Sequence, residues 1–118
     1  MKNYNIISPD PTLQTNLMAW GFMCGKGWFP LIEKLLDELQ AIEDKEQYGL
    51  QITEVKEKWG GLRVYINSGT DEIFDLIDRA ERESETICEL CGKPGKLRRD
   101  AGGWIMTRCD DCWAREVE

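Results

Sequence analysis

The sequence predicts an α+β fold in which helices pack on a β-hairpin sheet, followed by a C-terminal module of the treble-clef or zinc-ribbon type. Three observations carry this prediction: amphipathic helical patterns, an alternating segment around a Gly-Gly pair, and two Cys-x-x-Cys pairs. With 118 residues, the chain has room for one compact body, residues 1–86, and a four-cysteine zinc module, residues 87–118, docked on it.

Two helices are expected before the hairpin. The first covers residues 10–24, where Leu13, Leu17, Met18 and Trp20 have near-helical spacing. The second starts near Pro30, which suits a first helical turn, and should end before Tyr48-Gly49. Its core-facing stripe consists of Ile32, Leu35, Leu36, Leu39 and Ile42.

Residues 50–67 predict a β-hairpin that turns at Gly60-Gly61, because two glycines supply the positive φ angles of a two-residue turn. This turn pairs Trp59 with Leu62. Glu57 then falls on the buried face and needs a partner or an edge position. The buried face should carry Val55, Trp59, Leu62, Val64 and Ile66, and the other face Glu54, Lys56, Lys58, Arg63 and Tyr65.

A third helix is expected over residues 70–86, with Thr70 as its N-cap and two acids in its first turn. Its buried side should carry Ile73, Phe74, Ile77, Ala80 and Ser84. The helix reaches the first cysteine pair without Gly or Pro, so the zinc module should dock on the body rather than swing from it.

The strongest signal is a pair of Cys-x-x-Cys motifs separated by 17 residues, formed by Cys88, Cys91, Cys109 and Cys112. Two such pairs, joined by a hairpin, complete the tetrahedron that zinc prefers, so we expect one structural Zn²⁺. Iron–sulfur, disulfide and redox roles are the alternatives. A closed four-sulfur shell has no position for a substrate, so the ion should stabilise structure rather than do chemistry. A helix after the second pair would indicate a treble clef, whereas a plain zinc ribbon lacks it.

Composition and charge exclude several classes of function. The chain has no His, which removes Ser-His and Cys-His catalysis, and its net charge of −7 argues against indiscriminate coating of nucleic acid. No apolar run has the length of a membrane span, and the first residues lack the apolar core of a signal peptide. We therefore expect no membrane partner and a cytoplasmic location, where thiols stay reduced.

Basic residues concentrate on the two predicted hairpins of this acidic chain. Between positions 93 and 108 there are five bases against one acid. Such a surface suits phosphate or an acidic partner, although charges of this kind also serve simply to keep a hairpin solvated. The partner contacts that we expect are Lys56, Lys58, Arg63, Tyr65, Arg98 and Trp104.

The tryptophans and the fifth cysteine divide between core and surface. Trp20, Trp28 and Trp59 are expected in the core. Trp104 and Trp113 are expected at the surface, because the small zinc module has little core to bury them, and exposed Trp often anchors interfaces. Cys24 is left over. With no His or neighbouring carboxylate in the sequence to activate it, Cys24 is expected to be a buried or incidental thiol rather than a nucleophile.

Several stretches combine into one pattern: Cys24-Gly25-Lys26-Gly27-Trp28, the run from Val55 to Tyr65, Ala80-Glu81, Ser84, and the cysteine pairs with Gly103-Trp104 between them. This pattern resembles a family of small phage and prophage proteins over residues 20–113. The family has no assigned activity, so the resemblance implies origin and not mechanism. Small phage proteins without catalytic residues commonly bind and block a host protein, including components of defence systems.

These observations favour a non-catalytic, zinc-stabilised binding protein that engages and inhibits a host macromolecule, such as a defence-system or gene-expression protein. Its acidic body could also imitate the charge of a nucleic acid. The alternative is a nucleic-acid-binding regulator that uses the zinc-module hairpin. An enzyme, such as a nuclease, is a third class that the missing His and the closed metal shell disfavour.

Overall fold

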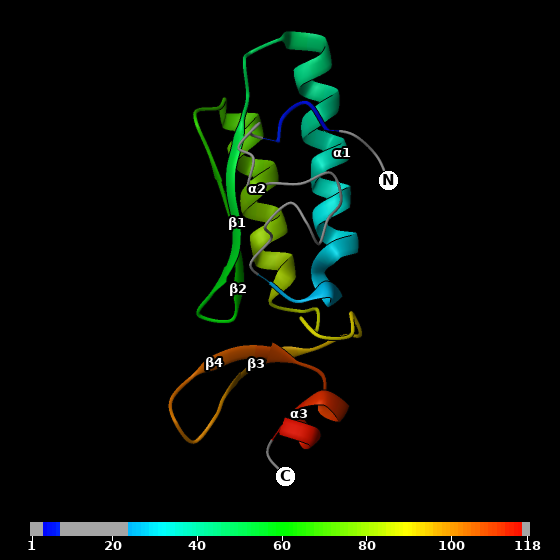
Figure 1. Ribbon diagram of the computed structural model, residues 1–118, viewed down its shortest axis with the longest axis vertical. Coiled ribbons are helices and arrows are strands. Elements are labelled where there is room, and N and C mark those ends of the chain that lie inside the picture. Colours follow the sequence, from blue (N-terminus) through cyan, green and yellow to red (C-terminus); the bar gives the residue numbers. More distant parts are fainter. Residues whose placement is uncertain (1–3, 8–23, 117–118) are drawn as a thin grey trace.

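The computed structural model describes residues 4–7 and 24–116. These residues form an α+β structure with two small antiparallel sheets of two strands each (Figure 1). The helix expected over residues 10–24 lies outside the described part, apart from its last residue. In chain order the elements are η1 (Lys26–Trp28), α1 (Phe29–Glu46), β1 (Ile52–Lys58), β2 (Gly61–Ile66), α2 (Asp71–Ser84), β3 (Lys96–Arg99), β4 (Ile105–Arg108) and α3 (Asp110–Glu116).

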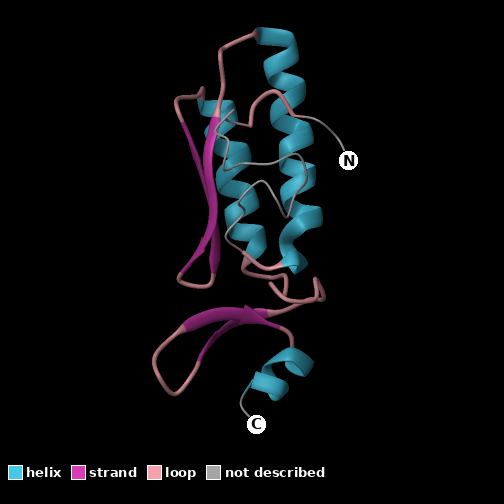
Figure 2. Cartoon of the chain, in the orientation of Figure 1, coloured by secondary structure: helices cyan, strands magenta, loops and turns pink. Residues whose placement is uncertain are grey.

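The elements form two groups along the long axis of the molecule. Helix α2 packs against β2 on one side and against α1 on the other, so the first hairpin and the two long helices make one layered unit (Figure 2). The second hairpin and α3 lie beyond the turn of the first hairpin (Figure 1). Within the described residues, no helix is both long and apolar enough to cross a membrane.

Helix α1 forms where the apolar spacing predicts it. Pro30 lies in its first turn, and the helix ends at Glu46, where Gln47 takes a left-handed conformation with φ of 54°. This end before Tyr48 agrees with the prediction. The predicted stripe is buried at Ile32, Leu35, Leu36 and Leu39, with Ile42 packed at its edge.

Helix α2 begins as predicted, because the Thr70 hydroxyl accepts a hydrogen bond from the Ile73 amide at 3.3 Å. Its buried positions are Ile73, Ile77, Ala80 and Ser84. The prediction that Phe74 is buried is wrong, since its side chain is 49% exposed. One residue turns a helix by about 100°, so Phe74 points away from the face that Ile73 buries.

The first hairpin turns one residue earlier than predicted. Trp59 and Gly60 both have positive φ, of 55° and 83°, and Lys58 pairs with Gly61. The prediction that Trp59 pairs with Leu62 on the buried face is therefore wrong; Trp59 sits in the turn and is 64% exposed. Each β1 residue pairs with a β2 residue two positions earlier than predicted. Because side chains alternate between faces, a shift by two positions leaves the remaining residues on their predicted faces.

Glu57, placed on the buried face by the sequence, finds its partner in the turn. Its carboxylate accepts a hydrogen bond from the Gly60 amide at 2.7 Å. The buried face itself carries Val55, Leu62 and Val64, which are all part of the core.

Helix α2 also covers the outer edge of β2. The Leu62 amide donates to Ser84 Oγ at 2.9 Å, and the Val64 amide donates to Glu81 Oε2 at 3.0 Å. These two amides point away from β1, so without the helix they would have no partner in the sheet. Two helix side chains thus supply the hydrogen-bond acceptors that a third strand would supply.

Two contacts join the first unit to the cysteine-bearing segment. At the hairpin turn, Thr107 Oγ1 donates to the Gly60 carbonyl at 2.5 Å. Gly60 has φ of 83°, and a Cβ there would lie 2.7 Å from the Leu97 side chain and 3.2 Å from the Met106 Cα, so this position favours glycine.

The second contact is made by residues 24–28. Trp28 is fully buried, as predicted, and its indole N–H donates to the Ile87 carbonyl at 2.8 Å. The Gly27 amide donates to the Glu89 carbonyl at 2.7 Å, and a Cβ on Gly27 would come within 2.2 Å of the Cys88 carbonyl oxygen. The Gly-rich run therefore wraps the first cysteine pair closely.

Candidate metal centre

Four cysteines from two separate segments meet at one point. The Sγ atoms of Cys88, Cys91, Cys109 and Cys112 all lie within 4.8 Å of one another, and those of Cys91 and Cys109 are 3.5 Å apart. A disulfide needs a separation of about 2 Å, so these sulfurs are not bonded to each other, and all five cysteines of the chain are free. The cluster could hold a metal ion.

The first cysteine pair is shaped by a tight turn. The Gly92 amide donates to the Cys88 carbonyl at 2.9 Å, and the Cys88 amide donates to the Lys93 carbonyl at 2.7 Å. Gly92 takes φ of 84°, a conformation that favours glycine. The chain therefore reverses immediately after Cys91, which aims both sulfurs the same way.

The second pair lies where β4 gives way to α3. Cys109 follows the last residue of β4, and Cys112 lies in the first turn of α3, so one helical turn brings the two sulfurs together. The Cys112 amide points at Cys109 Sγ at 3.4 Å.

Backbone amides prepare part of this cluster for ionisation. Burial opposes ionisation of Cys88, but hydrogen bonds from the amides of Cys109, Cys91 and Leu90 outweigh it and lower the pKa of its thiol to about 6. The Cys112 amide likewise lowers the pKa of Cys109. The pKa of Cys112 rises to about 12, because its hydrogen bond to Cys109, burial and the charge of Cys88 all disfavour a further thiolate. A cation among the sulfurs would relieve this mutual opposition.

Cationic side chains line a hollow beside the sulfurs. Lys26, Lys93 and Arg115 line this hollow of about 460 Å³, which also exposes Cys91, while Asp111 is the acid on its wall. Four thiolates with one divalent ion keep about two negative charges, which neighbouring cations offset in part. Their position supports a centre with all its sulfurs ionised.

A buried ion pair beside the first cysteine pair has no counterpart in the sequence-based predictions. Arg108 Nη1 lies 3.3 Å from Glu89 Oε1, and both side chains are about nine-tenths buried. The other Glu89 oxygen accepts a hydrogen bond from the Gly25 amide at 2.8 Å. Glu89 thus ties the metal segment to residues 24–28. A charged residue inside Cys-x-x-Cys gives no local sign that it will be buried.

The outer face of the first hairpin carries four of the expected contact residues. Lys56 pairs with Glu54 at 2.8 Å and lies 5.5 Å from the centre of the exposed Tyr65 ring. Lys58 is exposed and has no ion pair with another described residue. Arg63 is half-buried, because its guanidinium folds back to donate to the Leu62 carbonyl at 2.9 Å.

The two contact residues expected on the second hairpin differ sharply. Trp104, which immediately precedes β4, is 72% exposed. Arg98 instead holds its own module together: its guanidinium bonds to Asp110 and to the Arg108 carbonyl, and lies 5.7 Å from the centre of the Trp113 ring. Arg98 therefore links β3, to which it belongs, to α3.

Cys24, the fifth cysteine, lies apart from the cluster and packs partly buried against the core. Burial raises the pKa of its thiol to about 12, and the charges of Glu89 and Glu57 add to the effect. A thiol that stays protonated near neutral pH is a poor nucleophile. This position agrees with the predicted incidental thiol.

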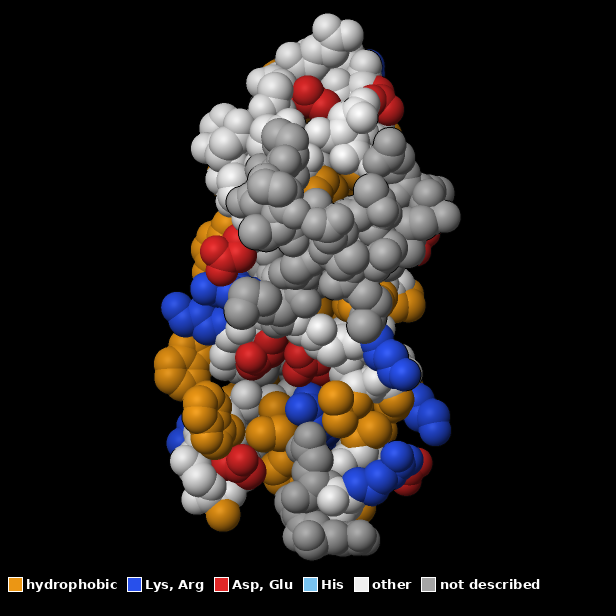
Figure 3. Space-filling model, viewed as in Figure 1, with side chains coloured by type: hydrophobic (Ala, Val, Ile, Leu, Met, Phe, Trp, Pro, Cys, Tyr) orange, Lys and Arg blue, Asp and Glu red, His pale blue; other side chains and the backbone are white. Residues whose placement is uncertain are grey.

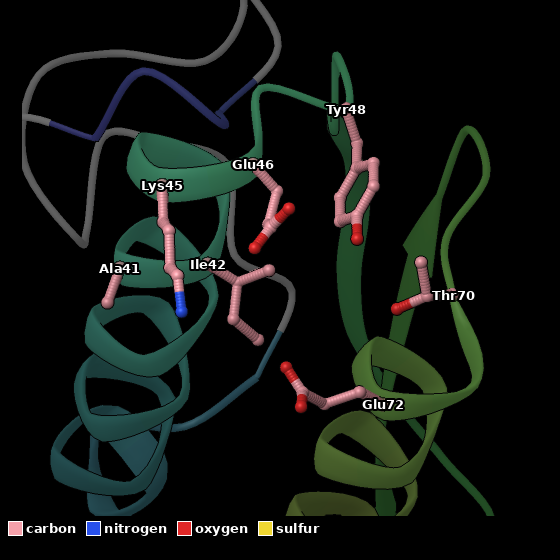
Figure 4. A pocket seen from close by; sticks show the side chains of 7 residues that line it. All are labelled: Ala41, Ile42, Lys45, Glu46, Tyr48, Thr70 and Glu72. Carbon is pink, nitrogen blue, oxygen red and sulfur yellow. The ribbon is translucent and has the colours of Figure 1, made fainter.

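A separate open hollow of about 480 Å³ lies between the end of α1 and the start of α2. Glu46 and Glu72 turn their carboxylates toward it from the two sides, and Tyr48 stands at its rim (Figure 4). All three side chains are exposed, and none makes an ion pair with another described residue. This arrangement is typical of solvated helix ends.

The chain was compared with models of protein families, with curated proteins and with solved structures, and none of the three comparisons gave a match.

Proposed function

We propose that the cysteine cluster holds one structural zinc ion. Zinc binds thiolate sulfur at about 2.3 Å in a tetrahedron, which places the sulfurs about 3.8 Å apart. The observed spacing, 3.5 Å for Cys91 and Cys109 and at most 4.8 Å overall, supports one such ion and leaves no room for a cluster of several.

The order of elements around the cluster supports a treble clef rather than a plain zinc ribbon. The first pair lies in a turn, the β3–β4 hairpin follows, and the second pair opens α3. Cys88, Cys91, Cys109 and Cys112 would bind the ion, and the ion would cross-link the two segments that carry them. Four protein ligands leave no coordination position for a substrate, which supports a non-catalytic role.

The zinc proposal is tested by metal analysis of the purified protein and by replacing the ion with Co²⁺. One ion per chain and the intense visible bands of a tetrahedral cobalt–thiolate centre are expected. Cys24→Ala should keep both results, whereas Cys91→Ala should lose them. Full cobalt spectra in Cys91→Ala would refute the ligand assignment.

We infer that the protein as a whole is a non-catalytic binding protein that engages and inhibits a macromolecule of its host. The observation that carries this proposal is the exposure of Trp59 and Trp104, the two most exposed of the described large apolar side chains, on the two hairpins. Trp side chains held in solvent by rigid turns are typical of binding hot spots. A host macromolecule is the partner expected from the resemblance to small phage proteins.

Affinity capture from host lysate, compared among variants, tests this proposal. Trp104→Ala should lose the captured partner, whereas Tyr48→Ala, which removes another exposed aromatic side chain near the end of α1, should keep it. Identical capture by both variants, or capture of nothing by the wild type, would refute the proposed contact surface.

A further inference from the structure

The contact between the two hairpins places two segments that carry exposed aromatic and basic side chains next to each other. Because Gly60 rests against Leu97 and Ile105, its neighbour Trp59 projects beside the second hairpin. We call this region the two-hairpin surface; its members are Lys58, Trp59, Leu97, Arg99 and Trp104. Figure 3 shows hydrophobic side chains next to basic ones along the edge of the molecule where the hairpins meet.

The charge of the two hairpins is opposite to that of the whole chain. Residues 52–66 and 96–108 together hold seven Lys and Arg side chains and three Asp and Glu side chains, in a protein of net charge −7. Lys58 and Arg99 are exposed and make no ion pair with any described residue. These two cations can therefore be offered to an anionic ligand without breaking an internal contact.

The three acids of the hairpins are already engaged. Glu54 pairs with Lys56, Glu57 accepts from the Gly60 amide, and Asp100 accepts from the amides of Gly102 and Trp104, both at 2.9 Å. The Asp100 contacts also fix the backbone that carries Trp104. The backbone at Trp104 is thus ordered before a ligand binds, which reduces the conformational freedom lost on binding.

We propose that the two-hairpin surface binds single-stranded nucleic acid, with bases stacked on Trp59 and Trp104 and phosphates held by Lys58 and Arg99. Aromatic side chains interleaved with cations match this ligand, because every base has a flat face and every nucleotide a charge. A duplex hides its base faces, and the acidic body would repel a long one. The proposal rests on the proposed function, since it names the class of partner for the same surface.

The test uses the zinc-loaded protein and a fluorescein-labelled oligothymidylate of about twelve nucleotides, within the site size of small single-strand binders. Wild type should bind it, and Trp104→Ala should weaken binding about fivefold to a hundredfold, as the loss of one base stack predicts. Trp104→Phe should recover much of this loss, and Tyr48→Ala should bind as the wild type does. Circular dichroism checks that each variant is folded, which the exposure of both aromatic side chains favours.

The salt dependence of the affinity distinguishes phosphate contacts from non-specific hydrophobic association. Two phosphate contacts on a single strand predict that raising salt fourfold weakens binding about sevenfold, and Lys58→Gln should remove about half of the logarithmic slope. A duplex of the same length and polyglutamate, an anionic polymer without bases, should compete poorly.

Three results would overturn the proposal: no binding of the oligonucleotide, equal competition by polyglutamate, or equal affinity of Trp104→Ala and wild type. Capture of a host protein from nuclease-treated lysate distinguishes this failure from that of the proposed function. If that capture depends on Trp104 while the oligonucleotide does not bind, the ligand is a protein and only the present inference fails. If neither binds, both proposals fail.

Discussion

The two halves of the molecule are held together by different forces. The described residues from 4 to 80 bury sixteen side chains in one hydrophobic cluster, which joins segment 4–7, η1, α1, the first hairpin with the preceding Leu50, and α2. In residues 87–116 the buried cluster consists of the cysteines Cys88, Cys109 and Cys112. The remaining buried side chains of that segment, Glu89, Thr107 and Arg108, are polar.

This difference indicates which interactions stabilise each half. A hydrophobic core of that size can stabilise the first half, at about 25 cal/mol per Å² of apolar surface buried. The second half is too short to build such a core, so the ion proposed for its cysteines would replace it, together with its polar contacts with the first half. Four predictions follow, from the largest expected effect to the smallest: the first three test this division, and the fourth tests a polar contact within the first half.

Removal of a metal ligand should unfold one half alone. Cys91 is the exposed cysteine of the cluster, so Cys91→Ala removes little packing and reports on metal binding. We expect residues 87–116 to lose protection from hydrogen exchange, because metal binding supplies on the order of 10 kcal/mol to small zinc modules. Amides of α1 and α2 should stay protected. The matched control is Cys24→Ala, and protection of both halves in Cys91→Ala would show that the metal is dispensable.

A cavity in the hydrophobic core should have the converse effect. Leu39 is fully buried, and Leu39→Ala should lower the free energy of unfolding of the first half by about 2–5 kcal/mol, measured by urea denaturation. The zinc content of the folded protein should not change. Ile42→Ala, half-buried on the same helix, should cost less; loss of zinc in Leu39→Ala would argue against two separately stabilised halves.

The junction between the halves should respond to a change of one atom. Thr107→Val keeps the shape of the side chain but removes its hydrogen bond to the Gly60 carbonyl, leaving a buried acceptor unsatisfied. The expected cost is about 1–3 kcal/mol, seen as earlier unfolding of residues 87–116 on heating. Thr86→Val is the control, because the Thr86 side chain is exposed and its hydroxyl donates to the Glu83 carbonyl of its own turn. Equal costs for both variants would mean that the junction contributes no stability.

The smallest effect concerns pH and the edge of β2. Burial raises the pKa of Glu81 above its ordinary value of 4.5, and the Val64 amide and the Arg63 guanidinium offset only part of this rise. A carboxyl whose pKa is higher in the folded state favours folding when protonated, so this contribution is lost as pH rises from 4.5 through the folded pKa.

Glu81→Gln keeps an acceptor for the Val64 amide but cannot ionise, so its stability should fall less than that of wild type over this pH range. Thermal unfolding at several pH values measures the difference. Glu72→Gln, an exposed change in the same helix, controls for the loss of one charge. A wild type that gains stability relative to Glu81→Gln as pH rises would reverse the sign and refute the explanation.

Elements with repeated local patterns could be predicted from the sequence, and features that depend on distant contacts could not. The stripes of α1 and α2 repeat over several turns, and the cysteine spacing carries its own geometry. The sequence does not predict the turn at Trp59-Gly60, because a Gly-Gly pair looks like a complete two-residue turn. Gly60 does lie in the turn, but Gly61 belongs to β2, where a Cβ would lie 2.8 Å from the Arg63 guanidinium, and no local pattern reports this contact.

The candidate site followed the same rule. The four cysteines could be named from their spacing, but the buried pair of Glu89 and Arg108 depends on the approach of residues 24–28, far away in the sequence. The basic run predicts that Arg98 contacts a partner molecule. In the structure its guanidinium pairs with Asp110, and the Arg98 side chain is largely buried. Charge runs indicate composition, and only the fold decides which members face solvent.

The helix side chains that cap the edge of β2 also bear on self-association. A two-stranded sheet offers two borders to which a neighbouring molecule could add a strand, the usual route to sheet-mediated aggregation. Ser84 and Glu81 close one border by occupying the amides of Leu62 and Val64. At the other border, the described segment 4–7 meets the start of β1, where the Ile52 amide donates to the Ile6 carbonyl at 2.6 Å. Because the β2 border is closed, any strand recruited from a second copy would have to add at the β1 border, which makes growth of the sheet one-sided.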